Sequence, residues 1–104
     1  MPNAANTIAE IASLIEPVAT KYGVKKLTVF GSFARGSARL GSDVDIRIAD
    51  RGTLRGLFRL AAFQADLERA LGRSVDILPT DAFNERFLAR IRDEEIVVYD
   101  APAA

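Results

Sequence analysis

Apolar residues recur along the chain with two different periods, and these periods predict alternating helices and strands. Between Thr7 and Gly23 they return every three or four positions, as on one face of an amphipathic helix. Thr7 with Glu10 resembles a capping box that begins this helix, and Gly23 is expected to end it. Pro17 lies inside the segment, where it predicts a kink or a restart.

Short runs rich in β-branched and aromatic residues predict strands at 25–30, 43–49, 74–79 and 95–100. The apolar period predicts a helix at 53–71 and a further helix after a cap at Thr80 or Asp81. Residues 32–37 suit either a short helix or a loop. This order indicates a single α/β (α+β) domain, in which a small mixed sheet has its helices packed on one side. We divide it into an N-terminal helix (1–24), an α/β core (25–100) and a loose tail (101–104).

The helix predicted at 53–71 carries an inner stripe that should pack on the sheet. Its members are Leu57, Leu60, Phe63 or Gln64, Leu67 and Leu71. Phe58 lies beside this stripe and is expected to widen the buried face, with a partner surface as the alternative. The charged run "RDEE" at 92–95 is expected to be a solvated helix end.

The composition restricts the chemistry that this chain can support. Its 14 basic and 14 acidic residues cancel, so no net field favours nucleic acid or an anionic membrane. The absence of cysteine and histidine from the sequence excludes disulfides, zinc–thiolate sites and a histidine general base. Any metal must bind hard oxygen ligands, which favours Mg²⁺ or Mn²⁺. No leader-like or membrane-spanning stretch is recognisable, so we expect a cytoplasmic protein that contacts neither nucleic acid nor membrane.

Asp43 and Asp45 alternate with apolar residues in "DVDIRIA", so both should leave the same face of a strand, about 7 Å apart at Cα. Two carboxylates at that spacing can bind one or two divalent cations, which relieve their mutual repulsion. Asp76, in "SVDIL", would complete a two-metal site if its strand neighbours 43–49. Taken alone, the Asp pair suits a solvated face, and Asp76 suits a salt bridge to Arg47 or Arg73.

Gly31 and Ser32 lie between a predicted strand and a predicted helix or loop. A glycine there lets a phosphate approach the backbone, and free N–H groups with the Ser32 hydroxyl can hold phosphate oxygens. Arg35 and Arg39 would add positive charge around a polyphosphate. Gly-Ser alone is most often a plain turn, but together with the three aspartates it indicates a metal–triphosphate site.

The stretch "GSFARGSARLGSDVDI" (31–46) contains Gly-Ser, ten residues and Asp-x-Asp, and it resembles the signature of the DNA polymerase β-like nucleotidyltransferase superfamily. With the later "VDIL" and "EEIVVYD", the chain is similar to the smallest branch, the minimal nucleotidyltransferases (MNT). These are usually the antitoxins of HEPN/MNT toxin–antitoxin pairs. The resemblance extends from the first helix to Asp100 and implies the polymerase β-like nucleotidyltransferase fold, with 25–100 as the catalytic core.

The resemblance also implies a reaction, in which AMP passes from ATP to a protein hydroxyl, thought to be a tyrosine of a cognate HEPN ribonuclease toxin. The residues it implies for catalysis are Gly31, Ser32, Asp43, Asp45 and Asp76. ATP would bind Gly31, Ser32 and Arg35, and two Mg²⁺ ions, or Mn²⁺ in their place, would bind the three aspartates.

Longer members hold the base and the acceptor with a second helical domain. Here a partner chain or self-association, as a homo- or hetero-oligomer, would supply those contacts. Two other interpretations stay open. One is an antitoxin that binds and masks its toxin with little turnover, and the other is a nucleotidyltransferase of a small molecule such as an aminoglycoside.

Overall fold

The computed structural model describes residues 5–39, 41–79 and 85–102, and strands from all three ranges join in one mixed sheet. The strands are β1 (Lys26–Phe30), β2 (Val44–Asp50), β3 (Val75–Pro79) and β4 (Ile96–Asp100). Their order across the sheet is β3-β2-β1-β4. Strand β1 is antiparallel to β2 and β4, whereas β2 and β3 are parallel, so β2 and β3 require the crossover that a helix provides.

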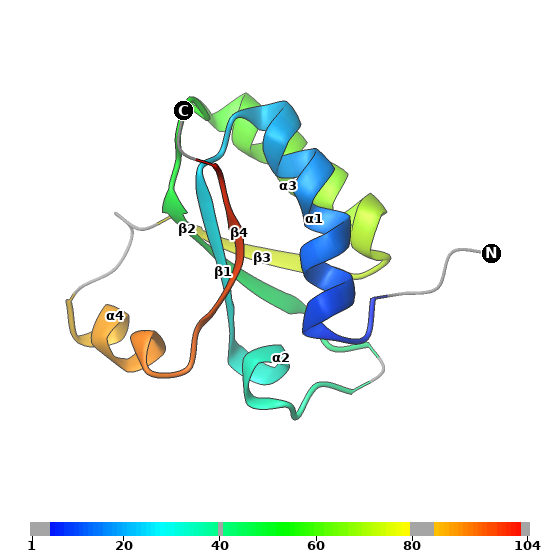
Figure 1. The fold of residues 1–104 in the computed structure, drawn as a ribbon, viewed down its shortest axis with the longest axis vertical. Coiled ribbons are helices and arrows are strands. Elements are labelled where there is room, and N and C mark those ends of the chain that lie inside the picture. Colours follow the sequence, from blue (N-terminus) through cyan, green and yellow to red (C-terminus); the bar gives the residue numbers. More distant parts are fainter. Residues whose placement is uncertain (1–4, 40, 80–84, 103–104) are drawn as a thin grey trace.

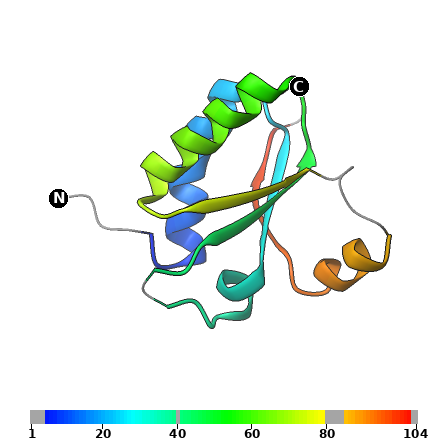
Figure 2. The same cartoon turned by 180° about the vertical axis from the view of Figure 1, so that it is seen from behind.

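Two long helices, α1 (Ile8–Tyr22) and α3 (Leu57–Leu71), lie side by side across one face of the sheet (Figure 1). The short helix α2 (Gly31–Arg35) follows β1 directly, and α4 (Glu85–Arg92) leads into β4. The view from behind shows α4 on the other side of the sheet from α1 and α3 (Figure 2). The predicted fold class, a small mixed sheet with helices in one small domain, is confirmed, but the expectation that the helices pack on one side is wrong for α4 (Figure 2).

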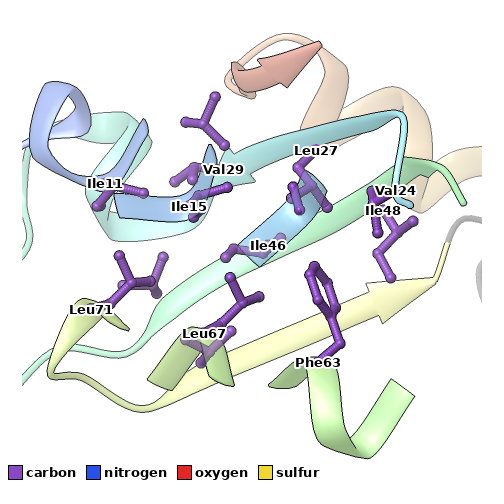
Figure 3. Close-up of a cluster of buried hydrophobic side chains, with 14 of the residues drawn as sticks. Ile11, Ile15, Val24, Leu27, Val29, Ile46, Ile48, Phe63, Leu67 and Leu71 are labelled. Carbon is purple, nitrogen blue, oxygen red and sulfur yellow. The ribbon is translucent and has the colours of Figure 1, made fainter. Parts of the chain in front are cut away.

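The hydrophobic core fills the space between the sheet and the α1–α3 layer (Figure 3). Strand β2 contributes Val44, Ile46 and Ile48, which are fully buried, while the residues between them are only half-buried. From the helices come Ile11, Ile15, Phe63, Leu67 and Leu71. Because side chains alternate along a strand, the packing of these three β2 residues turns Asp45 and Arg47 to the opposite face.

Helix α1 begins and ends at the predicted residues. The Glu10 backbone N–H donates to Thr7 Oγ1 at 3.1 Å, and Gly23 closes the helix with a φ of 72°. Pro17 lies inside one continuous helix, so the predicted restart is wrong. A proline removes only the bond to the carbonyl four residues earlier, and Ser13 lies on the exposed side of α1, where water can replace that bond.

Helix α3 starts later than predicted, and its first turn is not part of the core. Leu57 is 79% exposed and Phe58 is 91% exposed, so the predictions that they are buried are wrong. Leu54, which precedes the helix, is fully buried in their place. The helical period is correct from Phe63 onward, but a period cannot show how far a helix extends beyond the layer that it covers.

The predicted caps of α4 at Thr80 or Asp81 lie outside the described residues. Among the residues that are described, no helix is both long enough and apolar enough to cross a membrane.

Candidate active site

Asp45 and Asp76 lie opposite each other on neighbouring strands. The parallel pairing of β2 and β3 places the two residues in register, which confirms the predicted adjacency of their strands. Val44 and Ile46 are buried, so Asp45 leaves the sheet on the face away from the core, where it is half-buried. Asp76 is exposed, and Asp43, just before β2, is also exposed. The alternation of a strand therefore gives all three carboxylates a common face.

The electrostatic environment of Asp45 is unfavourable to its charge. Burial raises the pKa of Asp45 above its ordinary value, and the negative charges of Asp76 and Asp43 raise it further. A hydrogen bond between the Asp45 and Asp76 side chains acts in the same direction, while the Arg35 guanidinium opposes them. The effect of the neighbouring carboxylates on Asp45 thus exceeds the opposite effect of Arg35. A cation bound at such a site stabilises it by offsetting the excess negative charge.

Gly31, the residue that follows β1, lies against Asp45 on the side opposite β3. Strand β1 is antiparallel to β2 with Phe30 opposite Asp45, so the residue that follows β1 meets the Asp45 carboxylate. Gly31 has a φ of 72°, and a Cβ added to it would overlap Asp45 Oδ2. Both the left-handed backbone and the close approach require glycine here.

Ser32 is half-buried in the first turn of α2, a helix of five residues that Gly36 ends with a φ of 75°. The residue before the helix, Phe30, makes no side-chain capping bond to it. Of the two structures predicted for this segment, helix or loop, the structure has the helix. The turn from β1 into α2 therefore presents backbone N–H groups close to the carboxylates, as a phosphate-binding turn requires.

A pocket of about 310 Å³ opens beside this turn. Its lining consists of Phe30, Gly31, Arg35, Asp45, Phe87, Arg90, Ile91 and Glu94. The β1–α2 turn and β2 form one wall, and α4 with the residue two positions beyond it forms the other. The pocket therefore combines apolar rings, two arginines and the candidate metal ligand Asp45. A larger hollow of about 540 Å³ lies between α1 and β4, away from the aspartates.

The acidic pair that follows α4 is part of this site, and the prediction of a solvated helix end is wrong for it. Glu94 Oε1 accepts hydrogen bonds from the Gly31 backbone N–H at 3.2 Å and from Arg35 Nη1 at 3.3 Å. Glu95 accepts from Arg47 and from Thr28, and its side chain is only 14% exposed. The sequence shows only that both glutamates immediately precede the last predicted strand, and the pairing of β4 with β1, which brings them to the turn, is a tertiary contact.

The arginines considered in the sequence analysis do not all have the roles predicted for them. Arg35 lines the pocket, whereas Arg39 is not among the residues that line it. Arg47 pairs with Glu95 on the open face of the sheet. Arg73 donates to the backbone carbonyls of Ala5 and Ser42 and to the Asn6 side chain. The two candidate salt-bridge partners of Asp76 thus have other roles that explain their presence.

The donor chemistry fits a divalent cation such as Mg²⁺ or Mn²⁺, since every ligand offered is a carboxylate oxygen. Asp45 and Asp76 lie in register on neighbouring strands, and the charge of Asp76 acts on Asp45, so the two carboxylates can approach one cation. Among the described residues, however, no three His, Cys, Asp or Glu side chains are close enough to enclose a metal. Asp43 would have to turn toward the pair to supply a third carboxylate.

The comparison with known families identifies the class of protein. A family model described as the nucleotidyltransferase domain matches residues 11–99, so the chain belongs to the nucleotidyltransferase family. Within it, the chain is similar to protein adenylyltransferases. It is 29% identical over 96 residues to protein adenylyltransferase MntA of Thermococcus cleftensis, covering 88% of this chain and 96% of that protein. It is 35% identical over 91 residues to a Methanocaldococcus jannaschii protein provisionally named a protein adenylyltransferase, covering 88% and 97% respectively.

Solved structures agree with this assignment. One described provisionally as a minimal nucleotidyltransferase has a TM-score of 0.74 and 30% identity, covering 90% of this chain and 98% of that chain. A toxin–antitoxin crystal structure with AMP-PNP has a TM-score of 0.71 at 17% identity, covering 86% and 73%. A complex of the tri-AMPylated Shewanella oneidensis HEPN toxin with an MNT antitoxin has a TM-score of 0.66 at 14% identity, covering 91% and 74%. The last two share the fold with this chain.

Proposed function

We propose that this nucleotidyltransferase is a Mg²⁺-dependent protein adenylyltransferase that moves AMP from ATP to a tyrosine hydroxyl of a cognate HEPN-family toxin and thereby acts as its antitoxin. The observation that carries the proposal is the placement of Asp45 between Asp76 on β3 and Gly31 at the β1–α2 turn. This placement joins a carboxylate site to a phosphate-binding turn in one small region.

In this proposal the β1–α2 turn binds the nucleotide. The backbone at Gly31 and the Ser32 hydroxyl donate to phosphate oxygens, and Arg35 adds a guanidinium from the end of α2. Asp43, Asp45 and Asp76 would hold the cations. Two bound Mg²⁺ ions would neutralise the charge that develops on the phosphate and on both the attacking and the leaving oxygens.

The transfer itself is a substitution at the α-phosphorus of ATP. A tyrosine oxygen forms a new bond to this phosphorus, and the bond from the phosphorus to the oxygen bridging the α- and β-phosphates breaks. Pyrophosphate leaves with that oxygen, and the hydroxyl proton passes to solvent. The chain contributes position and charge, which is sufficient for phosphoryl chemistry in a site built without histidine.

Support for a protein acceptor comes from the relatives. Two relatives that match 88% of this chain are named protein adenylyltransferase, one of them provisionally, and a neighbour in fold is a complex of an AMPylated HEPN toxin with an MNT antitoxin. The pocket beside the β1–α2 turn is lined by Phe30, Arg35 and Phe87 among others, and in this proposal a partner chain completes the contacts to the base and the acceptor.

The proposal is tested by incubating the purified chain with its HEPN partner, Mg²⁺ and α-³²P-ATP, followed by a denaturing gel. We expect label on the partner that disappears with Asp45→Asn or with removal of the divalent cation. Ser32→Ala should weaken ATP binding by about 3- to 10-fold through the loss of one hydrogen bond and leave Mn²⁺ binding unchanged. Ser13→Ala, on the exposed side of α1, is the matched control.

Two outcomes would contradict the proposal. A partner that stays unlabelled, yet is still silenced by both the wild type and Asp45→Asn, would show that the chain acts by masking. Label that appears on an aminoglycoside and not on the protein would show a small-molecule acceptor.

A further inference from the structure

A carboxylate of the chain itself already occupies the donors that the proposed function assigns to the nucleotide phosphates. Glu94 Oε1 lies 3.2 Å from the Gly31 backbone nitrogen. Arg35 Nη1 lies 3.3 Å from Oε1 and 3.4 Å from Oε2 of the same side chain. A carboxylate and a phosphate present the same kind of acceptor to an N–H group and a guanidinium. Glu94 is therefore chemically equivalent to part of the ligand.

The contacts of the neighbouring Glu95 are shorter and more buried than those of Glu94, and they provide the comparison for a structural ion pair. Glu95 receives two bonds of 2.8 Å from Arg47 and one of 2.9 Å from Thr28, and the Arg47 and Glu95 side chains are 13% and 14% exposed. The bonds to Glu94 are longer, and the Arg35 and Glu94 side chains are 55% and 30% exposed. Partly hydrated pairs of this kind contribute little to stability and are easily exchanged. Glu95 thus fixes the segment, while Glu94 is the displaceable member.

We propose that Glu94 is an internal competitor for the phosphate-binding turn, and that a nucleotide must displace its carboxylate from Gly31 and Arg35 in order to bind. This inference rests on the proposed function, because it takes Gly31 and Arg35 to be phosphate ligands. Fixing Glu95 on Arg47 keeps Glu94 within reach of the turn whenever the nucleotide is absent.

Competition by Glu94 affects which anions can bind at the β1–α2 turn. An incoming ligand must replace a full negative charge on Arg35, so a multiply charged triphosphate competes better than a monophosphate. Displacement also leaves the Glu94 carboxylate next to the bound phosphates, where repulsion weakens the complex. Removing the charge of Glu94 should therefore tighten nucleotide binding, although it deletes contacts seen in the structure.

The test is isothermal calorimetry with Mg²⁺ and AMP-PNP on the full chain without the HEPN partner, so that no acceptor hydroxyl is present to consume the nucleotide. We expect Glu94→Gln to bind about 3- to 10-fold more tightly than the wild type. Glu94→Asp retains the charge but is one methylene shorter, and it should also bind more tightly because it no longer reaches Gly31. The matched control is Asp93→Asn, an exposed neighbour that changes the net charge equally and should bind like the wild type. Thermal melts of all four proteins verify folding.

The outcomes separate this inference from the proposed function. In one outcome the wild type binds AMP-PNP, Ser32→Ala binds it more weakly, and Glu94→Gln binds it no more tightly than the wild type. Glu94 is then not a competitor, and the proposed function stands. A loss of affinity in Glu94→Gln would instead mark Glu94 as a residue that positions Gly31 and Arg35. If neither the wild type nor Glu94→Gln binds the nucleotide, the proposed function is wrong and the inference fails with it. An equal gain in Asp93→Asn would assign the effect to net charge and also overturn the inference.

Discussion

Gly31 and Asp45 are packed so closely that the glycine has no room for a side chain on the side of the carboxylate. Gly31 directly follows β1, whose last residue, Phe30, pairs with Asp45 on β2. A Cβ on Gly31 would overlap Asp45 Oδ2, and the backbone there has a φ of 72°. The proposed phosphate-binding turn and the candidate metal ligand are therefore in direct contact, and a change in either is expected to disturb the other.

Gly31→Ala should destabilise the fold and displace Asp45. Left-handed backbone costs a residue with a Cβ about 1–2 kcal/mol, and the overlap with the carboxylate adds to this. Gly36→Ala is the matched control, because Gly36 has a φ of 75° but nothing within 4 Å of an added Cβ. Denaturant unfolding should show a larger loss for Gly31→Ala, and Asp45→Ala should remove the excess in the double variant. Equal losses at the two glycines would contradict the steric argument.

Asp45→Asn should abolish activity and yet stabilise the protein. Burial and the neighbouring aspartates raise the pKa of Asp45, so the folded state binds a proton at Asp45 more tightly than the unfolded chain does. The free energy of unfolding therefore falls as the pH rises through this raised pKa, and the penalty is present at neutral pH.

In EDTA at pH 7, Asp45→Asn should consequently melt at a higher temperature than the wild type, by about 4–8 °C for each kcal/mol gained. The exposed Asp100→Asn should not change the melting temperature. A lower melting temperature for Asp45→Asn would show that the carboxylate is not repelled by its neighbours.

Glu95→Gln should destabilise the fold by about 2–3 kcal/mol, because Arg47 then loses the ionised partner that compensates its partial burial. Burial of Glu95 acts to raise its pKa, but hydrogen bonds from Arg47 and Thr28 and the charges of Arg47 and Arg92 outweigh it, so the pKa is lowered. A lowered pKa contributes stability that is present above the ordinary pKa of glutamate and is lost as the pH falls through the lowered value.

The difference in unfolding free energy between the wild type and Glu95→Gln should therefore be constant near neutral pH and shrink in acid below the ordinary glutamate range. Denaturant titrations at several pH values measure it, with the exposed Glu16→Gln as the control. A difference that persists unchanged in acid would contradict the role of the charge.

Phe58→Ser should leave stability within about 0.5 kcal/mol of the wild type, since the ring is 91% exposed. Phe63→Ala, five positions along the same helix and fully buried, should cost about 3–5 kcal/mol. Denaturant unfolding of both variants decides whether the first turn of α3 is outside the core. A loss of stability in Phe58→Ser comparable with that in Phe63→Ala would show that Phe58 is buried, as the sequence pattern predicts.

Much of the candidate site follows from short-range pattern. The alternation of Val44, Ile46 and Ile48 determines that Asp45 leaves the sheet on the open face, because a strand reverses its side chains at each residue. The Gly-Ser pair and the Asp-x-Asp pair have fixed spacing in the sequence, so the family resemblance could be recognised without a structure. The beginning and end of α1 are equally local, since Thr7 and Gly23 act on the adjacent turns.

Contacts between distant segments were decided only by the tertiary structure. The sequence shows "RDEE" as a charged run, and nothing local indicates that Glu94 meets Gly31, 63 residues earlier, or that Glu95 meets Arg47. The same period covers Leu57 and Phe63, yet only Phe63 has the sheet beneath it. Periodicity reports which face of an element is apolar, whereas the layer opposite that face depends on how the whole chain is arranged in space. For that reason the carboxylates and the glycine–serine turn were predictable, and the glutamate that bonds to that turn was not.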